Sequence, residues 1–204
     1  MPTTQPSLFD APIVPGLRYG EALISPDEEA TLIARIGQLP LTPFRFQGWE
    51  GKRQTISFGW HYDFDDARFA RTDPIPDFLQ PVRARAAAFA GLDADALVHA
   101  LVIRYDPGAG IGWHRDRPVF EHVVGVSLGV ATSLRLRRRT GTGFVRAALP
   151  IAPRSIYHLS GEARHQWEHS IAEMDVRRWS ITFRSLSAKG ETIRHAHHPL
   201  TSGA

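Results

Sequence analysis

From Ala96 onward the chain is a succession of short apolar and β-branched runs separated by turn residues. The turns read DPGAG, TGTG and SGE. Short strands at this spacing are typical of a sandwich or a barrel. The sequence therefore predicts a β domain over residues 96–187. Its expected strands lie at 98–105, 122–130, 133–138, 144–149, 154–160, 165–171 and 178–186.

Two helices are expected before this β domain. Ser25 is followed by a proline and, three residues on, by Glu28, which is the pattern of a capping box with proline at the first helical position. A second helix is expected over residues 77–90, with Gly91 after its end. Residues 41–64, which are aromatic and basic with glycine breaks, predict two or three strands or lid loops.

The organisation expected from these patterns has four parts. They are a flexible N-terminal tail at 1–20, helices and a substrate lid at 21–95, the β core at 96–187, and a flexible C-terminal tail at 188–204. No apolar run approaches the ~18 residues of a membrane span, and the N-terminus lacks the pattern of a secretory signal. We expect a cytoplasmic, monomeric protein that does not enter a membrane.

Cysteine and charge usage narrow the chemistry. The chain has no cysteine, which excludes disulfides, a thiolate metal site and a cysteine nucleophile. Among its 24 basic residues only Lys52 and Lys189 are lysines, and the others are arginines, whose planar donor fork suits phosphate. The densest cluster is RLRRR at 135–139. The alternative explanation of the arginine excess is a biased amino-acid composition. The alternative explanation of the cluster is a solvated strand end.

His114 and Asp116 stand two residues apart in GIGWHRDRP, after a run that resembles a strand. Residues i and i+2 of a strand point to one face, so both side chains can reach one ion while Arg115 points away. A further histidine from another strand would complete a 2-His-1-carboxylate triad, which leaves positions on Fe(II) open for a bidentate co-substrate and O2. The residues alone leave three histidines open as the third ligand: His158, His165 and His169.

A carboxylate co-substrate needs a cationic partner near the metal, and the segment RRWSITFR offers one. By alternation, Arg178, Ser180, Thr182 and Arg184 share one face of the last predicted strand. Two arginines on one strand face, among apolar neighbours, would be costly to desolvate without anions. The alternative is an edge strand whose arginines are solvated.

Taken together, these motifs resemble the AlkB family of Fe(II)/2-oxoglutarate dioxygenases. The matching pieces are RYDPGAGIGWHRD at 104–116, VGVSLG at 124–129, GEARHQWEHSI at 161–171 and RRWSITFR at 177–184, in family order. RQTISFGWHYDF at 53–64 resembles the lid of some branches. The spacing within GEARHQWEHSI is closer to the tRNA-hydroxylase branch than to the founding repair enzyme.

The resemblance implies an α+β, mainly β fold: a double-stranded β-helix, or jelly roll, with N-terminal helices and a nucleotide-recognition lid. It implies Fe(II) held by His114, Asp116 and His169. It also implies 2-oxoglutarate held by Tyr105, Arg178, Ser180 and Arg184, with O2 as the second co-substrate. On the substrate side we expect Trp49, Arg53, Tyr62 and Arg164, because aromatic rings among basic residues suit a flipped base and its phosphates. The alternative is that the lid aromatics only pack on the core.

Two positions depart from the family pattern. Ile103 stands where many members have an asparagine that contacts 2-oxoglutarate, and Pro118 stands where some members have an acidic residue that contacts the damaged base. The activity implied is oxidative demethylation of N-alkylated bases in DNA or RNA, which releases formaldehyde, succinate and CO2. One alternative is the same iron chemistry on a modified tRNA nucleoside, a protein or a small molecule. Another is a catalytically silent nucleic-acid-binding module.

The N-terminal segment QPSLFD, Gln5 to Asp10, resembles the short peptides that bind the bacterial sliding clamp. We therefore expect the clamp as a further partner. The alternative is that Leu8 and Phe9 dock on the protein's own surface.

Overall fold

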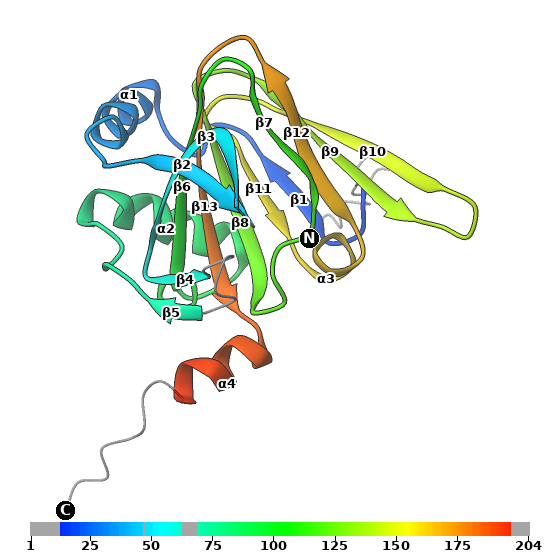
Figure 1. Ribbon diagram of the computed structural model, residues 1–204. Coiled ribbons are helices and arrows are strands. Elements are labelled where there is room, and N and C mark those ends of the chain that lie inside the picture. Colours follow the sequence, from blue (N-terminus) through cyan, green and yellow to red (C-terminus); the bar gives the residue numbers. More distant parts are fainter. Residues whose placement is uncertain (1–12, 47, 63–68, 197–204) are drawn as a thin grey trace, which may run out of the picture.

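A computed structural model describes residues 13–46, 48–62 and 69–196 of the chain (Figure 1). The strands are β1 (Leu17–Gly20), β2 (Thr42–Phe46), β3 (Trp49–Phe58), β4 (Trp60–Tyr62), β5 (Phe69–Arg71), β6 (His99–Tyr105), β7 (Ala109–His114), β8 (Phe120–Leu128), β9 (Thr132–Arg139), β10 (Phe144–Ile151), β11 (Ile156–Leu159), β12 (Glu168–Met174) and β13 (Arg178–Leu186). The helices are α1 (Pro26–Ile36), α2 (Gln80–Ala90), α3 (Gly161–His165) and α4 (Ala188–Ala196), with short 3-10 turns η2 (Asp77–Leu79) and η3 (Ala94–Ala96).

Two antiparallel sheets form the body of the protein. The larger has seven strands in the order β1-β11-β8-β13-β6-β3-β2, and the smaller has four in the order β10-β9-β12-β7. Strands β4 and β5 form a separate two-stranded ribbon. The predicted α+β, mainly β class is confirmed.

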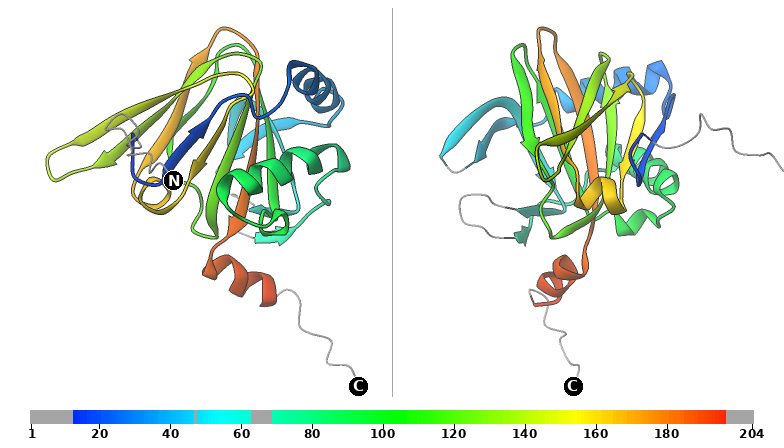
Figure 2. Two further views of the ribbon diagram at one scale, coloured as in Figure 1. Left: turned by 180° about the vertical axis from the view of Figure 1, so that it is seen from behind. Right: turned by 90° about the vertical axis from the view of Figure 1, so that its right-hand side faces the viewer.

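The strands from β6 to β13 alternate between the two sheets, except that β9 and β10 form a hairpin within the smaller one. β6, β8, β11 and β13 belong to the larger sheet, and β7, β9, β10 and β12 make up the smaller one (Figure 2). Leu134 and Leu136 of β9 meet Val123 of β8 and Leu159 of β11 in a buried cluster between the sheets. This layout is the one expected of a jelly-roll core over residues 96–187. Strand β1 extends the larger sheet at β11, and β3 extends it at β6.

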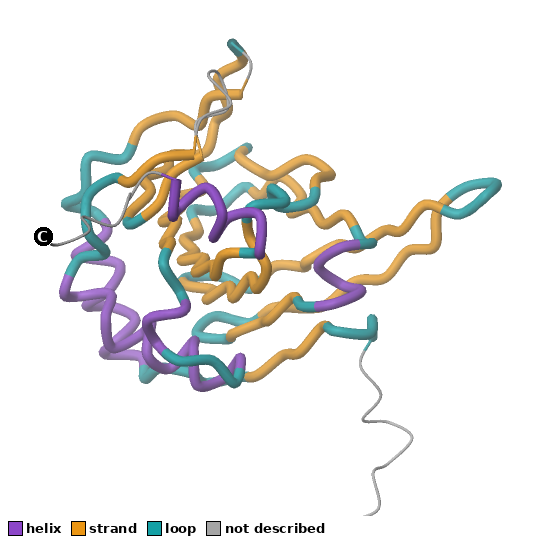
Figure 3. The backbone as a smooth tube through the Cα atoms, turned by 90° about the horizontal axis from the view of Figure 1, so that it is seen from below, coloured by secondary structure: helices purple, strands orange, loops and turns teal. Residues whose placement is uncertain are grey.

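Helices α1 and α2 pack on the outer face of the larger sheet. Leu32 of α1 and Val82 of α2 join Ile181 and Phe183 of β13 in a second buried cluster. These helices lie on the opposite side of the molecule from the β9–β10 hairpin, which projects away from the rest of the chain (Figure 3).

The start of the first helix and the end of the second lie where their sequence signals predict, whereas the second begins at Gln80, after a 3-10 turn over the first three residues expected to be helical. The Ser25 Oγ accepts a hydrogen bond from the Glu28 N–H, and the Glu28 carboxylate accepts one from the Ser25 N–H. Helix α2 is followed by Gly91 in the left-handed conformation, with φ of 72°. Glycine is favoured at this position because it carries no Cβ.

The prediction of a flexible tail over residues 1–20 is wrong for its last part. β1 pairs with β11, with Leu17 opposite Leu159, and both Val14 and Leu17 are buried. The apolar residues that make this contact are few and stand among prolines. Only the pairing with a distant strand therefore identifies this segment as ordered. The clamp-like segment Gln5 to Asp10 lies outside the described residues.

The prediction of a flexible tail over residues 188–204 is wrong for α4. The Ser187 Oγ accepts a hydrogen bond from the Gly190 N–H at 3.2 Å and so caps the helix. Ile193 packs against the buried cluster that contains Trp60 and Val119. Gly190 itself lies against the Val119 carbonyl, since an added Cβ would stand 2.2 Å from that oxygen.

The region expected to hold strands or lid loops contains β2, β3 and β4. Strand β3 pairs with β6, so part of this region extends the core sheet. Phe58 and Trp60 are buried, so these two aromatic rings of the region pack on the core. The side chains of Trp49 and Tyr62 lie outside what the structure describes.

Within the described segments, no helix is both long and apolar enough to cross a membrane.

Candidate metal centre

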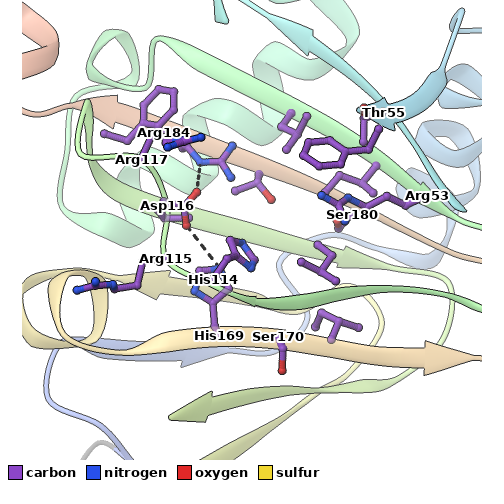
Figure 4. Close-up of a pocket in the computed structure, with 18 of the residues that line it drawn as sticks. Arg53, Thr55, His114, Arg115, Asp116, Arg117, His169, Ser170, Ser180 and Arg184 are labelled. Atoms are coloured by element: carbon purple, nitrogen blue, oxygen red, sulfur yellow. Dashed lines mark hydrogen bonds and ion pairs between the residues drawn. The ribbon is translucent and has the colours of Figure 1, made fainter. Parts of the chain in front are cut away.

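His114 is the last residue of β7, and Asp116 lies in the loop that follows. The prediction that both stand on one strand is therefore wrong for Asp116, because the ladder ends before it. The ligand atoms of His114, Asp116 and His169 nevertheless lie within 4.8 Å of one another (Figure 4). Arg115 points away from them, as expected, and donates a hydrogen bond to the His165 carbonyl at 3.0 Å.

The structure brings His169, and neither of the other two candidate histidines, to this pair. Strand β12 pairs with β7 in a register that sets His169 opposite His114, with 4.2 Å between the ring centroids. His165 ends α3 and lies 2.8 Å from a glutamate of β8. His158 faces another histidine of β8, with 3.0 Å between the ring nitrogens. The expected strand over residues 165–171 would place His165 and His169 on one face, but His165 lies in a helix and does not share that face.

The two carboxylate oxygens of Asp116 have different surroundings. Oδ1 accepts a hydrogen bond from the Arg184 Nε at 2.6 Å. Oδ2 is buried, has no hydrogen-bond partner among the described residues, and lies 3.5 Å from the His169 Nε2. Burial alone would raise the pKa of Asp116, but Arg184 and His169 hold it well below its usual range. A buried, ionised oxygen without a partner is costly, and a cation is the ligand that fits it.

The two imidazoles have the protonation state of metal ligands. Burial lowers the pKa of His114, and burial together with His114 lowers the pKa of His169 to about 3. The His114 Nδ1–H donates to the Gly112 carbonyl at 2.9 Å, which leaves Nε2 for an ion. Neutral imidazoles and an ionised carboxylate are the forms that bind metals. These residues therefore fit the 2-His-1-carboxylate pattern of Fe(II) sites.

One face of β13 forms the floor of the pocket. Arg178, Ser180, Thr182 and Arg184 all line the pocket and are buried, while the residues between them pack under the helices. The alternative of a solvated edge strand is wrong, because β13 lies between β8 and β6 in the larger sheet.

Arg178 is a buried cation without a carboxylate partner among the described residues. It is 1% exposed, its Nη2 donates to the Ser127 Oγ at 3.0 Å, and its Nε has no partner. Its guanidinium carbon lies 5.2 Å from the ring centroid of Tyr105, the residue opposite it on β6. An unpaired buried charge is strongly destabilising, so this end of the pocket requires an anion.

Arg184 occupies the other end of the same face. Besides Asp116, it reaches His99, whose Nδ1 accepts from the Arg184 Nη1 at 3.2 Å. Burial and the Arg184 charge lower the pKa of His99 well below its ordinary value, so this ring is a neutral acceptor. No sequence motif singles out His99. Its strand parity with Tyr105 is the signal that would have found it.

Two further pocket residues lie on neighbouring strands of the larger sheet. Ile103 of β6 is 3% exposed and stands between Thr55 of β3 and Ser180 of β13 in the ladder. Arg53 of β3 also lines the pocket, near Ser180 (Figure 4). Its guanidinium carbon lies 3.7 Å from the ring centroid of Phe44, and burial lowers its pKa.

Arg164 lines the pocket from α3 but is bound to the backbone. Its Nη2 donates to the carbonyls of Arg117 and Phe120, at 2.7 and 2.6 Å. Arg164 therefore holds the loop that follows Asp116, and the substrate contact expected of it stays a prediction.

Comparison with known proteins identifies the family. A model of the 2OG-Fe(II) oxygenase superfamily matches residues 16–184. This chain belongs to that superfamily. The match includes the three candidate iron ligands and the whole pocket face of β13. The candidate metal site and the candidate co-substrate site therefore both lie within the matched region.

The relatives of this oxygenase include AlkB homologues. It is 30% identical over 166 residues to the tRNA (carboxymethyluridine(34)-5-O)-methyltransferase alkbh8 of Xenopus tropicalis, a match that covers 77% of this chain and 25% of that protein. It is 25% identical over 212 residues to the human alpha-ketoglutarate-dependent dioxygenase alkB homolog 4, covering 86% of this chain and 68% of that protein. The Alkylated DNA repair protein ALKBH8 homolog of Arabidopsis thaliana is 25% identical over 223 residues, a match that covers 95% of this chain and 62% of that protein. The chain thus spans about a quarter of the Xenopus protein.

Solved structures share the fold. OsALKBH1 superposes with a TM-score of 0.64 at 15% identity, over 83% of this chain and 96% of that chain. A prolyl-4-hydroxylase of Pseudomonas putida superposes with a TM-score of 0.58 at 14% identity, over 84% and 93%. The antiparallel double-sheet fold is therefore shared with OsALKBH1 and with a prolyl-4-hydroxylase.

The enzyme uses Fe(II) and 2-oxoglutarate. His114, Asp116 and His169 are the residues that would hold the iron, and Arg178 with Tyr105 would bind a carboxylate of 2-oxoglutarate. When bound with O2, these groups supply oxidation of a substrate C–H bond, coupled to conversion of 2-oxoglutarate to succinate and CO2. The chain supplies the fixed geometry, the charges and the enclosure.

Proposed function

We propose that this oxygenase oxidatively demethylates an N-alkylated base in nucleic acid. Hydroxylation of an N-methyl group gives a product that releases formaldehyde and leaves the unmodified base, with succinate and CO2 as co-products. The observation that carries the proposal is the charge of the pocket, whose lining holds seven arginines and only two acids, Asp116 and Glu168.

This excess of arginine is more than one co-substrate needs. Asp116 pairs with Arg184, Glu168 pairs with Arg137 outside the lining, and Arg45 forms an exposed pair with Glu50. A dicarboxylate accounts for Arg178 and part of the remaining charge. Further arginines of the lining suit the phosphates on either side of a nucleotide. The cavity of about 1250 Å³ exceeds the ~300–1,000 Å³ of ordinary small-molecule sites and leaves room for a base beside the co-substrate.

A base must leave its stack to reach a buried centre. The β2–β3 hairpin carries Phe44 and Arg53 at the pocket, a ring and a cation in contact. We assign this hairpin as the nucleotide-recognition lid, with Trp49 as its stacking residue. The name of the Arabidopsis relative, an alkylated DNA repair protein, supports a damaged base as the target.

Mass spectrometry of short oligonucleotides tests the proposal. Single-stranded DNA, duplex DNA and RNA carrying N1-methyladenine or N3-methylcytosine are incubated with the protein, Fe(II), 2-oxoglutarate and ascorbate. We expect loss of one methyl group with the wild type and none with His114→Ala. Conversion of 2-oxoglutarate to succinate without any loss of methyl would refute demethylation while leaving the oxygenase intact.

A second candidate is hydroxylation of a modified tRNA nucleoside, and Pro118 favours it. The Pro118 carbonyl accepts from the Ser187 Oγ at 2.6 Å, and the position offers no carboxylate to contact a damaged base. The Xenopus relative is named for a tRNA uridine. Nucleosides from enzyme-treated bulk tRNA would then gain one oxygen, which liquid chromatography with mass spectrometry detects.

A further inference from the structure

The outer face of the smaller sheet carries arginines interleaved with aromatic rings. Strand β9 contributes three of the arginines, β10 contributes an arginine and a ring, and β7 contributes the second ring. We call this group the arginine–aromatic ladder. Its members are Trp113, Arg135, Arg137, Arg139, Phe144 and Arg146.

Arg137 is the centre of the ladder. Its guanidinium carbon lies 4.5 Å from the ring centroids of both Trp113 and Phe144, so it joins β7 to β10 across the sheet. Arg139 and Arg146 lie 5.9 and 5.6 Å from the Phe144 centroid. Cation–π contacts of this kind hold a guanidinium in place while its N–H donors stay available.

The ladder has an excess of positive charge. Arg137 is the member that pairs with an acid, Glu168, and Arg135 donates to a serine hydroxyl at 3.0 Å. Arg139 and Arg146 are exposed and contact no carboxylate among the described residues. Unneutralised cations beside accessible rings suit a ligand that combines anionic groups with flat ones, as a polynucleotide does.

The ladder continues into the pocket. Trp113 contacts two ladder arginines and also lines the pocket, and it precedes the candidate ligand His114 in the chain. Strand β7 is the edge of the smaller sheet, so a ligand that crosses from β10 to β7 arrives at the pocket rim. The β9–β10 hairpin extends this face away from the helices (Figure 3).

We propose that the arginine–aromatic ladder binds single-stranded RNA and leads one nucleotide into the pocket; this rests on the proposed nucleic-acid substrate. Along the path from β10 to β7, arginines surround the Phe144 ring and Arg137 contacts Trp113, so cations for phosphates and rings for bases follow one another. The rings offer stacking to the bases between them. RNA loops and single strands present unpaired bases that stack on rings and guanidinium planes, which is the combination this face offers.

Fluorescence anisotropy with a short labelled, unmodified single-stranded RNA tests the ladder. The variant is Arg139→Gln/Arg146→Gln in the full chain. The matched control is Arg18→Gln/Arg35→Gln, which also removes two exposed arginines that contact rings, here Phe89 and Phe78 on the helical side.

We expect the ladder variant to raise the Kd for RNA roughly fivefold to tenfold and to lower the slope of log K against log salt by about 1.4, twice the ~0.7 per phosphate of a single strand. The control should bind as the wild type does. Conversion of 2-oxoglutarate without nucleic acid should be the same in all three proteins, because the ladder arginines do not touch the iron ligands.

Four results would overturn the proposal. If both variants lose RNA affinity equally, the effect is one of net charge alone. If the ladder variant binds RNA as the wild type does, the ladder is not the RNA-binding surface. Binding of single-stranded or duplex DNA as tight as that of RNA, or equal competition by polyglutamate, would remove the assignment to RNA. Failure of the wild type to demethylate any oligonucleotide, with the ladder effect intact, would refute the proposed reaction and leave the ladder standing.

Discussion

Replacing Ile103 by asparagine restores the residue that many AlkB-type enzymes carry, and the structure predicts opposite effects on stability and on co-substrate binding. Ile103 is 3% exposed and packs with Tyr105 and Ala109. Losing its buried side chain costs about 2 kcal/mol. Burying an amide adds about 1–3 kcal/mol where it stays unsatisfied, and the neighbouring Thr55 and Ser180 hydroxyls offset part of this. The free energy of unfolding should therefore fall by about 2–4 kcal/mol.

Binding of 2-oxoglutarate should improve in the same variant. A hydrogen bond from the new amide to a carboxylate contributes about 1.5 kcal/mol or more, which is roughly a tenfold lower Kd. Urea denaturation without 2-oxoglutarate measures the stability, and a titration with Mn(II) in place of Fe(II) measures the affinity without turnover. Ile103→Val is the control: it should lose about 1 kcal/mol of stability and bind 2-oxoglutarate as the wild type does. An asparagine variant that is less stable but binds no more tightly would show that Ile103 does not face the co-substrate.

Three further predictions follow from buried groups. Arg178→Met should raise the stability of the ligand-free protein by about 1 kcal/mol or more, because it removes an unpaired buried charge, and should weaken 2-oxoglutarate binding more than tenfold; a loss of stability in urea would contradict this. Gly125→Ala should cost at least about 2 kcal/mol of unfolding free energy, since the added Cβ would stand 2.2 Å from the Tyr157 ring, whereas Gly141→Ala, with nothing within 4 Å, should be neutral by the same assay. Burial, reinforced by a neighbouring histidine, lowers the pKa of His158 to about 4, so the unfolded chain takes up a proton first and stability falls as pH drops from about 6.5 towards 4. His158→Gln should flatten that fall by up to about 2 kcal/mol, and parallel pH profiles of the two proteins would refute the assignment.

The pocket face of β13 was predictable because strand parity is a local property. Once a strand is assumed, Arg178 and Arg184 must share a face, and the structure places both in the pocket. The choice of His169 over His165 was not local. It depends on the turn of helix that ends at His165, and only the family resemblance favoured the right residue.

The remaining differences have one physical source, which is contact between segments far apart in the chain. Strand β1 and helix α4 are held by pairing and packing against distant strands, and their own sequences contain few apolar residues. His99 belongs to the site because β6 pairs with β13, which places it opposite Arg184. Asp116 leaves the strand yet stays in the cluster, because Arg184 from the far sheet fixes its carboxylate.

The unpaired charge of Arg178 has a consequence for the life of the protein in the cell. A ligand that neutralises this charge stabilises the native state in proportion to the logarithm of its concentration. The fraction of molecules that open to proteases should therefore fall when 2-oxoglutarate is plentiful and rise when it is scarce. Through one arginine, the stability of the enzyme would then depend on the supply of its co-substrate.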